Sequence, residues 1–153
     1  MKEIPLTKGA VAIVDDDMYE YLNQFHWYLN TEGYAIRETW KPKTRIRMHR
    51  EILGTPPGMD TDHINNNRLD NRRENLRVCT RTQNLQNSSL RSDSTSGYKG
   101  VSWFKPAKMW KAQIKIGKRV IAKYFKTPLE AAKAYNEMAT EYFGKFAKLN
   151  EIP

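Results

Sequence analysis

Apolar residues in the first third of the chain come in short runs that alternate with polar stretches. Residues 10–14 form one such run and predict a short buried strand, after which Asp15 to Asp17 can cap a helical turn. Two further runs, at residues 27–29 and 34–36, flank a polar turn and predict a hairpin. Residues 45–48 predict another strand, and the glycines and prolines of residues 54–58 then interrupt the pattern. We therefore expect a small N-terminal sheet.

The last third of the chain has the alternation of half-buried strands. Three strands are predicted, at residues 98–104, 110–116 and 120–125. Alternation in the middle strand gives it an apolar face that should pack on a helix, made of Trp110, Ala112, Ile114 and Ile116. Its opposite face should be solvent-exposed, and carries Lys111, Gln113 and Lys115.

A helix is predicted after the third of these strands. Thr127 can cap its N-terminus, Pro128 suits the first helical position, and Glu130 completes a capping box. Gly144 is placed to end it. The apolar positions fall on one helical face, formed by Ala131, Ala132, Tyr135, Met138, Ala139 and Tyr142. Three strands and one helix make the smallest two-layered unit.

Charge is distributed unevenly between the two ends of the chain. Residues 1–87 carry 13 Lys and Arg against 12 Asp and Glu, whereas residues 88–153 carry 13 against 5. Such one-sided positive charge favours binding to polyanions. The stretch at 88–97 is rich in serine and has little to bury. We predict an α+β protein whose parts are a domain at 1–90, a linker at 91–97 and a basic domain at 98–153.

Composition excludes several classes of protein. An apolar content of 39% in 153 residues favours two small cores over one large core. Cys79 is the only cysteine, which excludes an intrachain disulfide and a zinc site built on paired cysteines. No apolar run approaches the roughly 18 residues of a membrane span, and residues 1–5 lack a secretory signal. We expect a protein of the cytoplasm of a bacterial or phage-infected cell, not secreted and without a membrane partner.

Residues 59–90 are the most polar part of the chain, with few aliphatic anchors. They predict a strand, a long polar loop, a second strand at 75–80, and a helix capped by Thr80. Asp62 and His63 are adjacent in the first strand. Hydrolysis of a phosphodiester needs an activated water, a metal ion against the phosphate charge and help for the leaving oxygen. A carboxylate and an imidazole side by side can serve that chemistry if the strand twists or ends there.

The Asp62-His63 pair, Asn75 and Asn84 together resemble the motif of HNH endonucleases with Asn at the third position. Residues 69–77 match the phage and homing-endonuclease subgroup closely. The resemblance implies that His63 is the general base, and that Asp62 and Asn84 hold one divalent cation, Mg²⁺ or Mn²⁺. It also implies that Asn75 ties the loop together through its amide, and that double-stranded DNA is cut to leave a 3′-hydroxyl.

Three positions near the motif have two interpretations each. Asp60 shares a strand face with Asp62, so it is either an extra metal ligand or a solvated carboxylate, and the second is the favoured interpretation. Asn87 lies one helical turn after Asn84 and rivals it as the ligand, although the motif spacing favours Asn84. His49 belongs to an upstream element of the same subgroup, with either a packing or a catalytic role.

Residues 96–149 resemble the apetala/ethylene-response-factor DNA-binding domain. The matching positions are Gly97 to Val101, Trp110 to Ala112, Ile114, Phe125, Glu130 to Ala132, Ala134, Tyr135, and Gly144 to Asn150. In that family the sheet enters the major groove, which implies DNA contacts from Lys99, Lys111, Gln113, Lys115 and Arg119. We expect a homing-type HNH endonuclease that acts as a monomer or weak dimer. The alternative is a sequence-specific DNA-binding regulator with an inactive nuclease-like scaffold.

Overall fold

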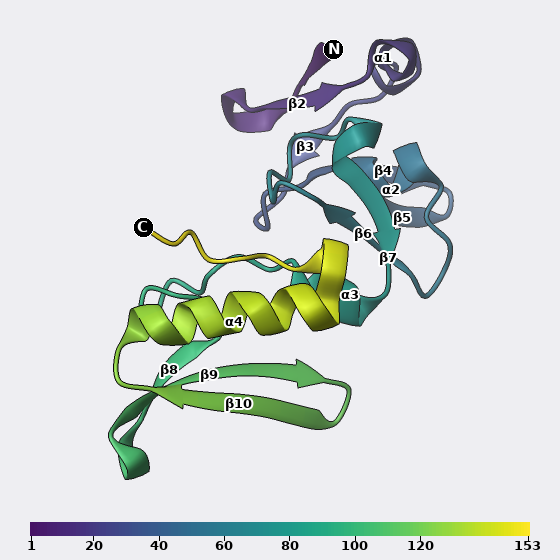
Figure 1. Ribbon diagram of the computed structural model, residues 1–153. Helices are drawn as coiled ribbons and strands as arrows, with labels where there is room; N and C mark the ends of the chain where they lie inside the picture. The colour runs from purple at the N-terminus through teal and green to yellow at the C-terminus, as the bar shows by residue number, and fades with distance from the viewer. The chain divides into compact units, whose positions relative to one another are not determined.

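The computed structural model describes residues 1–153 as a mixed α and β protein with several small sheets and few helices (Figure 1). Its internal contacts divide the chain into two compact units, Met1–Asn84 and Leu85–Pro153. The boundary lies ahead of the predicted linker at 91–97. Within that stretch the Ser96 hydroxyl donates to the carbonyl of Val101 at 2.8 Å and accepts from the amide of Tyr98 at 3.1 Å, so it is fixed within the second unit.

The first unit contains three small antiparallel sheets and short helices. The first sheet pairs β1 (Lys2–Pro5) with β2 (Val11–Val14). The second has the order β3 (Tyr28–Leu29), β4 (Ala35–Trp40) and β5 (Lys43–Arg47). The third pairs β6 (Asp60–His63) with β7 (Leu76–Cys79). The helices are α1 (Asp16–Leu22), α2 (Met48–Leu53) and α3 (Arg81–Gln86), with short 3₁₀ turns at Thr7–Gly9 and Arg73–Asn75.

The core of the first unit is built around Trp27, which is almost fully buried. Its indole Nε1 donates to the Leu22 carbonyl at 2.8 Å, so the ring's polar atom is satisfied inside the apolar cluster. The neighbouring core residues come from β1, β2, β4, α1, α2 and β7: Ile4, Ala12, Val14, Leu22, Ala35, Met48, Ile52 and Leu76. The N-terminal sheet predicted from the apolar runs is therefore part of one core with the strand that follows the polar loop.

Two local features of the first unit differ from the sequence-based expectation. Asp15 stands at the N-cap of α1 but makes no side-chain capping bond there, because its carboxylate accepts from the amide of Arg73 at 2.8 Å. Strands β4 and β5 also extend to Trp40 and from Lys43, beyond the predicted strands at 34–36 and 45–48. The Lys-Pro pair at 41–42 forms the turn between them, not a break in the sheet.

The second unit is a three-stranded antiparallel sheet covered on one face by a helix (Figure 1). Its strands lie in the order β10 (Arg119–Phe125), β9 (Met109–Ile116) and β8 (Val101–Phe104). Helix α4 spans Pro128–Phe143, and 3₁₀ turns follow β8 at Lys105–Ala107 and α4 at Gly144–Phe146. The capping box of Thr127 and Glu130 is formed on both sides, and Gly144 is the C-cap residue.

Alternation in β9 orders the two layers as expected. Ala112 and Ile114 are buried against α4, with Trp110 and Ile116 partly buried beside them. The predicted helix face is also buried except for Tyr142, which is 47% exposed, so its inclusion was wrong. Tyr142 lies in the last turn of α4, past the buried part of the helix. No helix of the protein combines the length and apolar character needed to cross a bilayer.

The C-terminal segment is tied to the second unit by one asparagine. The Asn150 backbone amide donates to the Asn136 amide oxygen at 2.8 Å, and the Asn136 amide nitrogen donates to the Asn150 carbonyl at 2.9 Å. The Asn150 side chain in turn bonds both backbone groups of Lys99, at 2.6 and 3.0 Å. This pairing joins α4 to the turn that precedes β8.

Candidate active site

The candidate active site is built on the hairpin of β6 and β7 with α3 after it. Cross-strand pairs in this hairpin include Asp62 with Arg77 and His63 with Leu76. Strand β6 ends at His63, which is the condition under which adjacent side chains can serve one site. Thr80 caps α3 as predicted: its hydroxyl accepts from the Gln83 amide at 3.2 Å, and the Gln83 side chain accepts from the Thr80 amide at 2.9 Å.

The loop between β6 and β7 is held by the side chain of Asn75. Its amide oxygen accepts from the Asn65 backbone at 3.0 Å, and its amide nitrogen donates to the Asp70 carbonyl at 2.8 Å. The Asp70 carboxylate is buried and bonds Arg72 and the Asn65 amide. The Arg72 guanidinium holds the pKa of Asp70 below its usual value. Asn75 therefore makes the loop-closing bonds that the family resemblance assigns to it.

The N-terminal sheet fixes the far side of the same loop. The Ile13 amide in β2 donates to the Leu69 carbonyl, and the Asn71 amide donates back to the Ile13 carbonyl, both at 2.8 Å. Asp17 adds an ion pair to the guanidinium of Arg73 at 2.7 Å. No sequence pattern connects residues 10–17 with the polar loop, because bridging between backbone groups leaves no side-chain signal.

His63 is buried in a cluster of aromatic rings. Its ring centroid lies 4.9 Å from that of His49 and 6.0 Å from that of Tyr34. Its Nε2 lies 3.1 Å from the amide oxygen of Asn71. The Asn71 amide nitrogen faces the Leu69 carbonyl at 3.4 Å, and its amide oxygen faces the imidazole of His63.

Burial lowers the pKa of both imidazoles of this cluster. Desolvation is the main cause that lowers the pKa of His63, opposed in part by the bond to Asn71. The pKa of His49 is lowered to about 3, by burial first and then by the nearby His63, Arg47 and Arg50. A neutral imidazole can accept a proton, which is the requirement for a general base. The arrangement gives His49 a packing contact with His63, one of the two roles left open for it.

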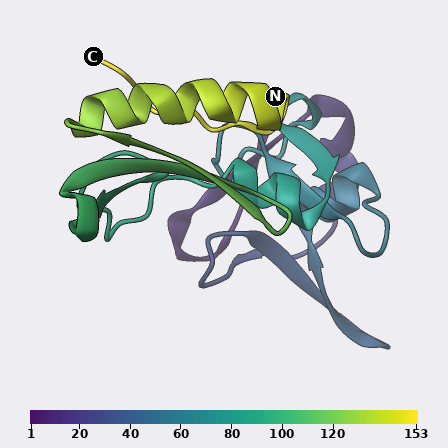
Figure 2. The same cartoon turned by 60° about the horizontal axis from the view of Figure 1, so that its bottom comes forward.

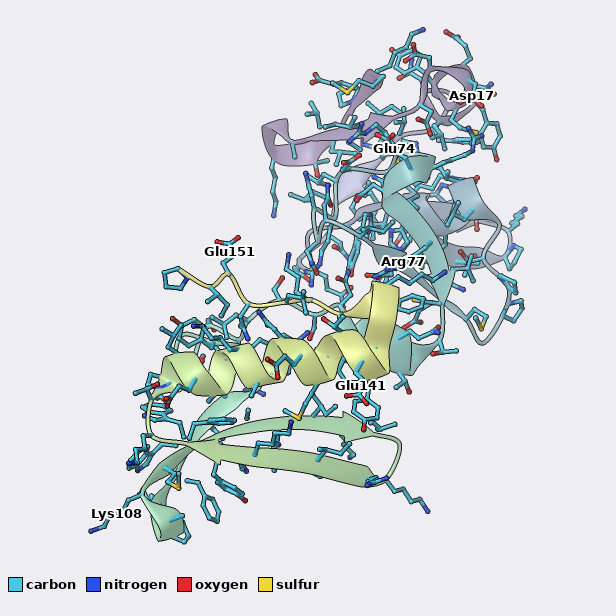
Figure 3. All side chains as sticks on the ribbon, viewed as in Figure 1. Asp17, Glu74, Arg77, Lys108, Glu141 and Glu151 are labelled. Atoms are coloured by element: carbon cyan, nitrogen blue, oxygen red, sulfur yellow. The ribbon has the colours of Figure 1, made fainter.

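Asp62 is nearly buried and paired with the residue opposite it in the hairpin. Its Oδ2 accepts from Arg77 Nε at 2.8 Å and from Nη2 at 2.6 Å. Figure 3 shows Arg77 projecting from β7. This two-pronged contact fixes the orientation of the carboxylate, because a guanidinium presents its donors in a rigid fork. Cross-strand pairing made Arg77 a neighbour of Asp62, and only the strand register could reveal it.

Asn84 lies next to Asp60. The Asn84 amide nitrogen is 3.0 Å from Asp60 Oδ2, and Arg81 approaches the same oxygen at 3.5 Å. The side chain of Asp60 is only 26% exposed, so it is not the freely solvated carboxylate that was the favoured interpretation. Asp60 and Asp62 share one face of β6. The helix thus brings Asn84 to the face that carries both carboxylates. Asn87 follows α3 and is buried, and its rivalry with Asn84 stays open.

The oxygen atoms at this face suit a hard divalent cation. No group of three His, Cys, Asp or Glu side chains is placed to hold a metal, so an ion here must also use amide or water oxygens. The 3.0 Å separation of the Asn84 amide and Asp60 matches the roughly 3.0 Å between neighbouring ligands of Mg²⁺ at about 2.1 Å. A half turn of the amide presents its oxygen in place of its nitrogen. The donor set therefore fits such an ion.

The predicted DNA-contacting residues of the second unit do not all lie on one face. Register places Lys111, Gln113 and Lys115 on the face of the sheet opposite α4, as expected. Arg119 pairs with Ile116, so it lies on the other face and its assignment was wrong. The resemblance assigned Arg119 by its position in the motif, whereas the face is set by the register of β10 against β9, which places Arg119 beside Ile116.

Lys99 is also not on the exposed face. It lies in a turn before β8, and its ammonium donates to the carbonyls of Gln86 and Ser88 at 2.5 and 2.7 Å. Burial, with a smaller contribution from Lys148, lowers its pKa to about 8. Because the Lys99 ammonium is bonded to backbone carbonyls of its own unit, the assignment of Lys99 to DNA contact was wrong. Phe104 and Tyr124 contribute aromatic rings to the exposed face instead, 5.2 Å apart.

Comparison with known proteins agrees with the site. A family profile described as HNH endonuclease matches residues 50–86. A protein of Acanthamoeba polyphaga mimivirus named as an uncharacterised HNH endonuclease is 32% identical over 151 residues, covering 95% of this chain and 77% of that protein. Protein 3.8 of Escherichia phage T7 is 34% identical over 74 residues, covering 48% of this chain and 61% of that protein. No solved structure matches the chain.

The chain belongs to the HNH endonuclease family, and it is a nuclease. The profile begins just after His49 and ends at Gln86, so it covers the hairpin and α3 that carry Asp62, His63, Asn75 and Asn84. DNA is the substrate of such an enzyme. The alternative of a regulator with an inactive scaffold is thereby set aside. Residues 98–153 remain a predicted ethylene-response-factor-type domain, which the matched profile does not cover.

Proposed function

We propose that the protein is a metal-dependent, homing-type endonuclease that hydrolyses phosphodiester bonds of double-stranded DNA with His63 as the general base. One observation carries the assignment: Nε2 of His63 lies 3.1 Å from the amide oxygen of Asn71, which fixes the orientation of the ring. In the proposed tautomer Nε2 carries the proton and Nδ1 takes the proton of the water, and the lowered pKa of His63 favours the neutral form that a base needs. The pairing of a nuclease motif with a strongly basic unit supports the homing type.

The chemistry follows from these side chains. Nδ1 of His63 takes a proton from a water, and the water oxygen attacks phosphorus. The bond from phosphorus to the 3′ oxygen breaks, and that oxygen takes a proton from solvent water and leaves as the 3′-hydroxyl. Asn71 keeps the imidazole turned to the water, and Arg77 keeps the Asp62 carboxylate in place. Asp62 and Asn84, with Asp60 beside them, would hold a divalent cation such as Mg²⁺, which supplies charge stabilisation at the phosphate and the leaving oxygen.

A nicking assay tests the metal requirement. Purified full-length protein is incubated with supercoiled plasmid in 5–10 mM Mg²⁺, about the range in which weakly bound Mg²⁺ sites fill. We expect nicked or linear plasmid in Mg²⁺ and intact plasmid once a chelator is in excess. Restoring Mg²⁺ to the chelated sample should restore cutting, which controls for unfolding. Cutting that continues at full rate in chelator would contradict the metal dependence.

The second unit is proposed to hold DNA through the sheet face opposite α4. Lys111 and Lys115 lie on this face with Gln113 between them, and Val120 and Tyr124 lie across from the two lysines on β10. Lysine is a point charge that suits phosphate better than base edges, so this face should bind DNA with little sequence preference. The corrected register removes Arg119 and Lys99 from the set.

Changing Lys111 and Lys115 to alanine together should weaken duplex binding and reduce the salt slope of the affinity by about two. The measurement is fluorescence anisotropy of a labelled duplex over a range of salt concentrations in chelator. Lys133→Ala is a matched control, because Lys133 is an exposed lysine of the same unit on α4. An unchanged slope in the double variant would mean that DNA lies elsewhere.

A further inference from the structure

Strands β4 and β5 form a two-stranded ribbon, the β4–β5 arm (residues 35–47), that ends in an exposed tryptophan. Five cross-strand pairs run from Ile36 with Arg47 at its base to Trp40 with Lys43 at its turn. Trp40 is 81% exposed, although tryptophan carries one of the largest apolar surfaces of any side chain. Figure 2 shows the hairpin extending away from the other elements of the first unit. The ring of Trp40 is therefore not part of the hydrophobic core of the first unit.

The two faces of the arm differ in what they contact. One face carries Arg37, which stacks on Phe25 at 4.0 Å and pairs with Glu51 at 2.7 Å, so this face is anchored to the body of the unit. Register places the opposite set on a second face, made of Ile36, Glu38, Trp40, Lys43, Arg45 and Arg47. This second face is termed the cationic face. Its three cations, Lys43, Arg45 and Arg47, occupy alternate positions of β5, and Lys43 pairs with Trp40 at the tip of the arm.

The cationic face continues into a basic groove of the same unit. An open groove of about 720 Å³ is lined by Arg45 and Arg47 of the arm together with Lys8 and Arg50. Glu32 is the only acidic side chain in its lining. Arg47 also lies over the ring of Tyr34 at 4.9 Å, and Tyr34 stacks on His49 at 5.0 Å. The positive strip thus runs from the tip of the arm to the aromatic cluster around His63.

The ion pairs along this strip are of a kind that a phosphate can replace. Arg45 pairs with Glu38 at 3.1 Å while its side chain is 76% exposed. Arg47 pairs with Glu32 at 2.7 Å with both partners about half exposed. Exposed pairs contribute little to stability, so exchanging the carboxylate for a phosphate costs the protein little. Lys43 and Lys41 beside Trp40 are also exposed.

We propose that the β4–β5 arm is a DNA-binding element of the nuclease unit: it lies in a groove of the duplex, its cationic face binds backbone phosphates, and Trp40 contacts the bases. A two-stranded ribbon has the width that the major groove admits. An aromatic tip between two lysines combines apolar contact with phosphate attraction. The proposal rests on DNA being the substrate of the enzyme, and it does not depend on the chemistry assigned to His63.

Tryptophan fluorescence of the full-length protein in chelator tests the contact without cleavage. Adding a blunt 30-base-pair duplex, about three helical turns, should quench part of the emission. Trp40→Phe should lose most of this quenching, whereas Trp103→Phe, which removes a half-exposed tryptophan of the second unit, should keep it. Quenching that survives in Trp40→Phe would overturn the proposal. So would quenching by single strands alone, because the arm is assigned to duplex.

Affinity gives a second, independent readout. Trp40→Ala should weaken duplex binding about tenfold, and Lys43→Ala should lower the salt slope by about one, with Lys133→Ala unchanged. Circular dichroism is expected to be unaltered, since Trp40 contributes nothing to the core. Equal duplex affinity of Trp40→Ala and the unaltered protein would refute the assignment of the β4–β5 arm to DNA binding. Plasmid nicking by His63→Ala reports on the catalytic proposal alone, so the failure of one proposal is distinguishable from the failure of the other.

Discussion

Replacing His63 by alanine is expected to lower the nicking rate of supercoiled plasmid by about 10²- to 10⁴-fold, the usual contribution of a general base. The physical reason is that the variant lacks the group that takes the proton of the attacking water, which in the proposed tautomer is Nδ1, with Nε2 bonded to Asn71. Rates should be measured at saturating DNA with Mg²⁺ in excess. Duplex affinity in chelator should stay close to that of the unaltered protein.

His26→Ala is the matched control for this variant. His26 is an exposed histidine of the same unit, so its loss removes an imidazole without touching the aromatic cluster. Asn71→Leu should give an intermediate loss of rate, because the imidazole remains but its tautomer is no longer fixed. Nitrogen-15 chemical shifts of the His63 ring should report Nε2–H in the unaltered protein. Full nicking activity in His63→Ala would remove the base assignment.

Gly100→Ala is expected to unfold the second unit or to lower its free energy of unfolding by about 3 kcal/mol or more. A methyl group at this position would lie 2.2 Å from two ring carbons of Tyr135 and 3.1 Å from the Gln113 carbonyl. Tyr135 is buried in α4 and cannot move aside, and Gln113 is fixed because its amide donates to the Gly100 carbonyl at 2.9 Å. Gly100 also has a φ of +73°, which disfavours any side chain.

Gly97→Ala separates the two causes. Gly97 has the same φ of +73° but no atom within 4 Å of an added methyl group. It should therefore cost only about 1 kcal/mol, the backbone penalty alone. Thermal unfolding followed by circular dichroism gives both values. If the two variants lose the same stability, the close approach of α4 to the turn at Gly100 is not what makes glycine necessary there.

Much of the fold could be predicted from local patterns. Helix α4 has its capping box, its proline and its terminal glycine where they were expected, because those signals act over a few residues. The β6–β7 hairpin and α3 were predicted for the same reason. Errors came at strand ends and in strand pairing: Arg119 was assigned to the wrong face because that assignment took no account of the register of β10 against β9. Strands β4 and β5 were predicted shorter than they are.

The residue types and spacing of the motif identified the candidate catalytic and metal-binding residues. They did not predict which side chains these residues contact. Arg77 and Asp62 are 15 positions apart, and Asn71 and His63 are 8 apart. Neither separation matches a strand or helix period, since both contacts depend on register and on the course of the loop. Asp60 was judged a solvated carboxylate because its contact with Asn84 requires the position of α3.

The amino-acid sequence by itself determined the class of enzyme, the side chains that can do its chemistry, and the basic character of its second half. These properties depend on residue type and short spacing, which folding does not alter. Only the tertiary structure decided which side chain bonds the imidazole of His63, which carboxylate meets Asn84, and which lysines face solvent. These depend on contacts between segments distant in the chain, and such contacts follow from packing and register, which short-range pattern does not specify.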